Sequence, residues 1–432
     1  IVRNNMNQSQ NSHDHRSQWV PPARPEWVKA VIEEGYGMDI GGVVPLDEAS
    51  LINTAMKNTG LDDFGSDEWV EPFRVLIKSL EEEAELHLMG RLIARSEILM
   101  LLEGRLQIED TYKKHPEIDD QEIVKPVIIV GQGRSGTSFM QNVLAHNVDF
   151  GALMHWEAML PCPPPEAATY TTDPRIDVAH KRICQWSRVT PGLDAMHEFS
   201  GRLPHEDMAV MGFNFMSPSL FDCMGQVASY DSMVFSPDWD WEPAFKYHKK
   251  VLKLLQWKNP RKHWVLKDPL HFDRMKTILK VYPDACFVWP HRDPVRALAS
   301  LVSIIGTIQW GRSDNPFKGG SLEYMTDPFS SAARFDAVIN QVESGEIPAS
   351  QLFSLNYKDL VKDPVGMMEK MLVEFGIGCS PEGRQSMQQY MDDNPRDARP
   401  PHQFNPGTPE TIARARQAFE RYESYFNVPR ET

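Results

Sequence analysis

A short apolar segment followed by a glycine-rich turn is the feature that most limits the fold of this 432-residue chain. Residues 126–130 read Pro-Val-Ile-Ile-Val, which is typical of a strand buried inside a parallel sheet. Glycines follow from Gly131 to Gly136, and the next apolar residues keep helical spacing: Phe139, Met140, Val143 and Leu144. This strand–loop–helix order predicts an α/β fold.

The same order returns three times further along the chain. Apolar segments at residues 264–266, 285–290 and 352–355 are each followed by an Asp-Pro pair, and the three aspartates are Asp268, Asp293 and Asp363. Asp is favoured as a helix N-cap and Pro suits the first helical turn. We therefore predict a P-loop-like parallel sheet flanked by helices, with ligands bound at the carboxyl ends of its strands.

The composition along the chain suggests three regions. Residues 1–20 are rich in Asn, Gln, Ser and His and are expected to form a disordered tail. Residues 21–120 are expected to form a helical N-terminal region, and one apolar stripe is predicted on Leu88, Leu92, Leu99, Leu102 and Leu106. Residues 121–432 are expected to form the α/β domain, with a less regular insertion at about 157–262. Methionines and phenylalanines at 208–233 suit either an apolar pocket or ordinary core filling.

Charge and cysteine content exclude several classes of protein. The formal net charge of −15 argues against a nucleic-acid partner. The five cysteines are scattered and form no Cys-x-x-Cys pair, so neither a disulfide framework nor a metal site is predicted. The chain opens without an apolar leader, and its longest apolar segment, 297–310, is too short to cross a bilayer. We therefore expect a cytoplasmic protein without a membrane partner; its oligomeric state is left open.

The turn between the first strand and its helix predicts a phosphate site. Backbone N–H groups, a helix N-terminus, hydroxyls and one cation would meet here. The candidate ligands are Gly133, Arg134, Ser135, Gly136, Thr137 and Ser138. A Walker A loop requires Lys where Thr137 stands, which weakens a kinase or ATPase interpretation and removes the main reason to expect magnesium.

A second candidate anion site follows the segment 285–290. Arg292 lies at the start of a predicted helix, and Ser300 lies about two turns further along the same helix. A guanidinium and a hydroxyl placed in this way can hold one phosphate between them.

Taken together and in order, these motifs resemble those of sulfotransferases that use 3′-phosphoadenosine 5′-phosphosulfate (PAPS). Residues 134–138 resemble the family's 5′-phosphosulfate loop, and Arg292 with Ser300 resembles its 3′-phosphate pair. Residues 264–269, Trp-Val-Leu-Lys-Asp-Pro, are similar to a strand end of the bacterial and tyrosylprotein-sulfotransferase-like branch. Tyr357 resembles a tyrosine that lies near the adenine. The resemblance covers about residues 125–376.

The resemblance implies transfer of a sulfuryl group from PAPS to an alcohol or phenol of a small-molecule acceptor, with release of 3′-phosphoadenosine 5′-phosphate (PAP). Arg134 and Lys267 are then the candidate cations for the leaving group. By resemblance, the first candidate for the general base is Glu157. His205 and His271 are its rivals.

Some alternatives stay open at this stage. The family's later Arg-Lys-Gly segment has no certain match, although Arg396 and Arg399 could replace it or simply lie in a solvated loop. The competing functions are a P-loop nucleotide kinase, which would need Mg-ATP, and a catalytically silent PAP-binding protein.

Overall fold

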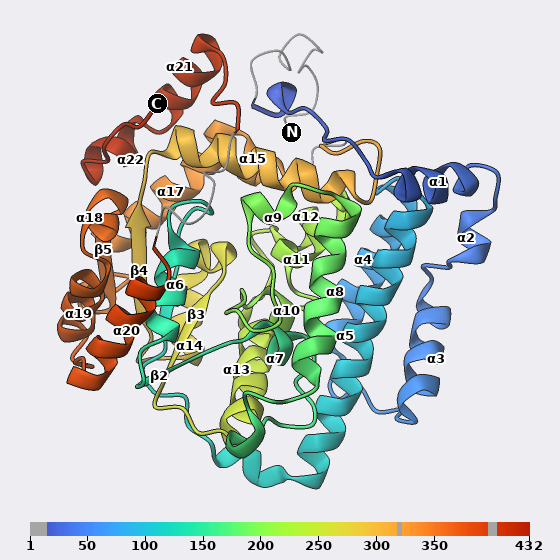
Figure 1. The fold of residues 1–432 in the computed structure, drawn as a ribbon, viewed down its shortest axis with the longest axis horizontal. Coiled ribbons are helices and arrows are strands. Elements are labelled where there is room, and N and C mark those ends of the chain that lie inside the picture. Colours follow the sequence, from blue (N-terminus) through green and yellow to red (C-terminus); the bar gives the residue numbers. More distant parts are fainter. Residues whose placement is uncertain (1–14, 318–321, 396–403) are drawn as a thin grey trace.

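The computed structural model of the chain describes residues 15–317, 322–395 and 404–432 (Figure 1). Its centre is a sheet of five strands in the order β2-β3-β1-β4-β5, in which every neighbouring pair is parallel. The strands are β1 (Val127–Ile129), β2 (Phe150–Ala152), β3 (His263–Lys267), β4 (Cys286–His291) and β5 (Leu352–Asn356). The predicted α/β fold is confirmed, and the sequence missed only β2 among these strands.

Helices cover both faces of the sheet. One face packs against α6 (Thr137–Ala145), α18 (Tyr357–Lys362), α19 (Pro364–Glu374) and α20 (Pro381–Asp393). The other packs against α13 (Glu242–Trp257), α14 (Met275–Val281), α17 (Pro328–Glu343) and α22 (Glu420–Tyr425). The side chains of consecutive β1 residues pack alternately on the two faces, because successive strand side chains point to opposite sides of the sheet.

The predicted Asp-Pro helix starts are present at all three positions. The Asp293 carboxylate accepts hydrogen bonds from the first backbone N–H groups of α15 (Pro294–Trp310). Asp363 caps α19 and Asp268 caps the 3-10 helix η6 (Pro269–Arg274) in the same way. These caps start helices directly after or near strand ends. Because neighbouring strands are parallel, the loops that follow the strands gather at one edge of the sheet.

Most of the N-terminal helices share one apolar core with the insertion, and the first of them packs with Val189 in a smaller cluster. They are α1 (Glu26–Gly35), α2 (Ile40–Val43), α3 (Glu48–Thr59), α4 (Val70–Glu82) and α5 (Leu88–Lys114). Phe215 of the insertion packs on Phe73 with ring centroids 4.8 Å apart. The predicted leucine stripe is wrong at Leu92, which is 46% exposed, because the buried face of α5 includes Ile98 and Leu101 instead.

The insertion is built mostly of short helices. They are α7 (His155–Met159), α8 (Arg175–Val189), α9 (Leu193–Met196), α10 (Met208–Gly212), α11 (Pro218–Met224) and α12 (Ala228–Val234). Its phenylalanines at 213, 215 and 221 are fully buried in the core. Core filling therefore accounts for most of the Met- and Phe-rich segment, although Met208 is an exception described below.

Part of the expected N-terminal tail is packed. Residues His15–Gln18 form a 3-10 helix, and the Trp19 indole donates to Thr307 Oγ1 on α15 at 3.4 Å. The prediction of disorder is wrong for these residues. Residues 1–14 of that tail, and Arg396 and Arg399, lie outside the described residues.

Two further α-helices pack on α15 and α17. They are α16 (Glu323–Thr326) and α21 (Pro409–Ala418). Within the described ranges, no helix combines the length and apolar character needed to cross a bilayer.

Candidate active site

The glycine-rich turn lies between β1 and α6, as the sequence predicts. Gly136 has φ +98° and precedes the first residue of α6. A side chain there would be strained and would lie 2.7 Å from the Tyr357 ring, so both the turn and its packing require glycine. Arg134 also has a positive φ of 73°, an uncommon conformation for a residue with a side chain. Ser135 Oγ donates to the Gln132 carbonyl at 2.7 Å and so ties the turn together.

Arg134 joins the turn to the second predicted anion site. Its Nε donates to Ser300 Oγ on α15 at 2.9 Å, and its carbonyl accepts from Arg292 Nη1 at 3.1 Å. Burial and the nearby charge of Arg292 lower the pKa of Arg134. Two guanidinium groups this close repel each other, so an anion bound between them would relieve an unfavourable arrangement.

Arg292 already holds a carboxylate of the same chain. Its Nε and Nη2 donate to the two oxygens of Glu431 at 2.8 and 2.9 Å. Burial alone would lower the pKa of Arg292, but the hydrogen bonds to Glu431 hold it above its ordinary value. The Arg292 guanidinium also lies 4.1 Å from the centre of the Tyr357 ring. The structure thus brings together Arg134, Ser300, Arg292 and Tyr357.

Lys267 is the last residue of β3, and its strand register places it beside Ile129 at the end of β1. Its ammonium donates to Ser138 Oγ at 3.1 Å and forms an ion pair with Glu206. The Lys267 side chain is only 2% exposed, whereas that of Glu206 is 21% exposed. Lys267 is therefore a nearly desolvated cation next to the turn, as predicted from its place at the strand end.

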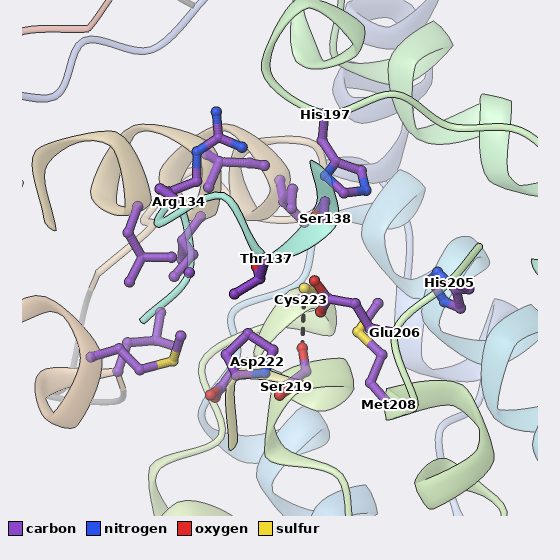
Figure 2. Close-up of a pocket in the computed structure, with 18 of the residues that line it drawn as sticks. Arg134, Thr137, Ser138, His197, His205, Glu206, Met208, Ser219, Asp222 and Cys223 are labelled. Atoms are coloured by element: carbon purple, nitrogen blue, oxygen red, sulfur yellow. Dashed lines mark hydrogen bonds between the residues drawn. The ribbon is translucent and has the colours of Figure 1, made fainter. Parts of the chain in front are cut away.

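Part of the turn and Glu206 line one cavity. Its volume is about 130 Å³, and its polar end contains Gly133, Arg134, Thr137 and Ser138. Figure 2 shows Arg134, Thr137 and Ser138 along one wall, Ser219, Asp222 and Cys223 across from them, and Glu206 between. The rest of the lining is largely apolar and includes Leu301, Ile304, Ile305 and Ile308 of α15. A charged end beside an apolar body suits a ligand of two unlike parts.

Glu157, the first candidate for the base, is not among the residues that line this cavity. It is fully buried in an ion pair with Arg261. Its Oε2 accepts hydrogen bonds from the Tyr170 hydroxyl at 2.9 Å and from the backbone N–H of Met154 at 3.1 Å. The Glu157 carboxylate is thus enclosed by three donors, so we propose that it stabilises the local fold.

The two histidine rivals lie in different places. His205 lines the cavity, and burial lowers its pKa to about 3. His271 lies outside the cavity lining and donates to Asp207 Oδ2 at 2.8 Å. Burial alone would raise the pKa of Asp207, but His248 and His271 hold it below its ordinary value. His271 thus belongs to a buried network next to the site.

Glu206 was not ranked among the candidate bases from the sequence, although its carboxylate lines the cavity, as does that of Asp222. In the sequence, Glu206 lies between His205 and Asp207. The backbone N–H of Asp207 donates to the Lys267 carbonyl at 2.9 Å. This long-range contact brings Glu206 to the strand end, and no local spacing signals it. His197, also in the lining, was missed for the same reason; burial lowers its pKa to about 4.

The fold and the site together define a class of protein: a parallel α/β protein with a glycine-rich turn at a helix N-terminus, cations close to that turn and a largely apolar cavity beside it. Comparisons with known proteins narrow this class. The model of the sulfotransferase family matches residues 126–381, more than half of the chain, and the protein belongs to that family.

Individual relatives are more distant. The chain is 25% identical over 138 residues to omega-hydroxy-beta-dihydromenaquinone-9 sulfotransferase Stf3 of Mycobacterium bovis and of Mycobacterium tuberculosis. That match covers 31% of this chain and 34% of those relatives.

Two solved structures share the fold over most of the chain. Sulfotransferase STF1 from Mycobacterium tuberculosis matches with a TM-score of 0.71 and 24% identity, over 88% of this chain and 98% of its own. Sulfotransferase STF9 from Mycobacterium avium matches with a TM-score of 0.74 and 23% identity, over 89% of this chain and 97% of its own.

Proposed function

We propose that this protein transfers a sulfuryl group from PAPS to a hydroxyl of a small-molecule acceptor and releases PAP. The observation that carries the proposal is the convergence of Arg134 and the turn hydroxyls at one end of a cavity whose remaining walls are mostly apolar, with Lys267 hydrogen-bonded to Ser138 of that end. A donor with charged phosphates and an acceptor with an apolar body fit its two ends.

The groups present match the chemistry of the donor. The backbone and hydroxyls of residues 133–138 would hold the 5′-phosphosulfate at the N-terminus of α6. Arg292 and Ser300 would hold the 3′-phosphate, and the bidentate grip of Arg292 on Glu431 supports its capacity to bind an anion. Tyr357, which packs beside Arg292, would lie against the adenosine.

The proposed chemistry requires cations and a base. Lys267 and Arg134 would stabilise the negative charge that develops on the bridging oxygen as its bond to sulfur breaks. Glu206 would accept the acceptor's hydroxyl proton as the new oxygen–sulfur bond forms. We favour Glu206 over His205 because its carboxylate is partly exposed and paired with Lys267, whereas burial makes His205 a weak base.

A hydroxylated small molecule is the proposed acceptor class. The relatives named Stf3 carry the name of an omega-hydroxy menaquinone derivative, which is a molecule of this class. The apolar residues of α15 in the cavity suit the body of such an acceptor.

Turnover with labelled PAPS and a panel of alcohols and phenols tests this function. Glu206→Gln is expected to lower the turnover roughly 10²–10⁴-fold while PAP affinity stays within a factor of a few. Asp238→Asn, an exposed acidic residue away from the cavity lining, is the matched control and should keep full turnover. Full activity of Glu206→Gln would exclude Glu206 as the base. Absence of sulfuryl transfer to every acceptor would contradict the function itself.

A further inference from the structure

A second cavity adjoins the one that contains the charged groups. Its volume is about 50 Å³, and it lies among α5, α7, α8, α10 and α11. The two cavities share Trp186, His205 and Met208 as lining residues. Much of the second lining is apolar and includes Ile93, Met100, Leu101, Ile183, Leu220 and Met224. An apolar space directly behind a reaction site can take a part of the ligand that the first space cannot contain.

The shared wall has a rigid part and an adaptable part. The Trp186 indole donates to Glu97 Oε1 at 2.8 Å, and the Arg312 guanidinium lies 4.7 Å from the centre of its ring. Arg312 in turn binds both Glu97 oxygens at 2.9 and 3.0 Å. Trp186 is therefore fixed in place by a charged pair.

Met208 is the adaptable part of the wall. It is the first residue of α10, and its unbranched side chain has three rotatable bonds. Figure 2 shows it beside Glu206, on the cavity side of α10. A change of its rotamer alters the wall without moving the backbone, which Ser217 anchors by donating to the Met208 carbonyl at 2.8 Å.

We propose that the acceptor is an alcohol with an extended aliphatic chain whose far end passes Met208 into the second cavity. This proposal rests on the proposed sulfuryl transfer, because that reaction places the hydroxyl at Glu206 and Lys267. The chain then runs past the apolar side chains of α15 in the first cavity, with Trp186 and Met208 framing the passage. Each methylene buried in this way improves binding by up to roughly fourfold.

A series of straight-chain primary alcohols from butanol to dodecanol tests the proposal. In the wild-type protein, kcat/KM is expected to rise with chain length, by up to roughly fourfold per methylene. Ala209→Met and Met100→Trp each add bulk to the second cavity from a different helix, α10 or α5. Both should flatten the rise for the longer alcohols and leave butanol turnover unchanged. The ratio of long-chain to short-chain kcat/KM cancels any loss of folded protein.

Binding measurements separate this proposal from the reaction it rests on. The same alcohols are titrated calorimetrically into protein saturated with PAP. If affinity rises with chain length in the wild type and this rise is flattened in both variants, the second cavity is supported as the site of the chain. That conclusion holds even if no sulfuryl group is transferred. Absence of transfer would then count against the proposed function alone. Equal affinity for all chain lengths, or a rise that both variants retain, would overturn the proposal whatever the turnover.

Discussion

The contact between Glu431 and Arg292 makes a prediction about donor affinity with an unexpected sign. If Arg292 binds the 3′-phosphate, Glu431 competes for the same guanidinium, so Glu431→Gln should tighten PAP binding. The pair is partly exposed, with side-chain exposures of 18% for Arg292 and 31% for Glu431. Exposed ion pairs contribute up to about 1 kcal/mol, and the bidentate geometry favours that upper end. We therefore expect PAP affinity to increase up to about fivefold.

The partner substitution should have the opposite effect. Arg292→Ala removes charge-assisted hydrogen bonds to phosphate worth about 1.5–3 kcal/mol, which corresponds to a loss of PAP affinity of roughly 10–150-fold. Glu420→Gln removes one exposed negative charge from α22 and controls for the change in net charge.

Calorimetric titration with PAP at low ionic strength measures all three variants. Added salt should reduce the gain of Glu431→Gln, because screening weakens the competing pair. Weaker PAP binding by Glu431→Gln, or no change in it, would refute the idea that this carboxylate stands where the phosphate binds.

Three further predictions concern the framework of the site. Glu157→Gln leaves the buried Arg261 without its counter-charge, so the free energy of unfolding measured in urea should fall by about 3–5 kcal/mol. Turnover per folded molecule should be retained. Loss of turnover in folded protein would restore Glu157 as the candidate base. Gly136→Ala should weaken PAP binding, because the new side chain introduces about 1–3 kcal/mol of backbone strain in the turn. Gly60→Ala is the control: it is also at positive φ, but no atom lies near its added Cβ, and PAP affinity should not change. Equal PAP affinity of the two variants would contradict this account. Burial lowers the pKa of His291 to about 3, so the unfolded chain binds this proton first. The contribution of His291 to stability should therefore fall by about 1.4 kcal/mol per pH unit from about pH 6.5 toward pH 3. The difference between the urea midpoints at pH 7 and pH 5 should be smaller in His291→Phe than in the wild type. An unchanged difference would show that His291 does not contribute to the pH dependence of stability.

The sheet could be predicted where local signals were strong. Asp293 and Asp363 mark helix starts because an Asp side chain caps the first N–H groups within the same short segment. Strand β2 escaped prediction because Gly151 interrupts its three residues, so it lacks the continuous apolar run that marks β1. Its place in the sheet depends on pairing with β3, more than 100 residues later, which no local pattern records.

The part of the site that we propose binds phosphate was predictable for a related reason. Parallel strands deliver the loops after β1, β3 and β4 to one edge, so Arg134, Lys267 and Arg292 had to lie near one another. The proposed base, Glu206, was not predictable in this way. Glu157 is held by Arg261 and Glu206 by Lys267, and both contacts join residues far apart in the chain.

The apolar residues of the insertion were ambiguous for a different reason. A phenylalanine that fills the core and a methionine that lines a cavity follow the same periodicity, and only the surrounding packing separates them. Phe213 is fully buried, whereas Met208 lies at the junction of two cavities.

Calorimetric titration of the protein with PAP, beside ATP with and without magnesium, tests the central claim most directly. The account predicts tight PAP binding that does not depend on magnesium, weak ATP binding, and loss of PAP affinity in Arg292→Ala. Magnesium-dependent ATP binding with no response to PAP would contradict the account and favour a nucleotide kinase.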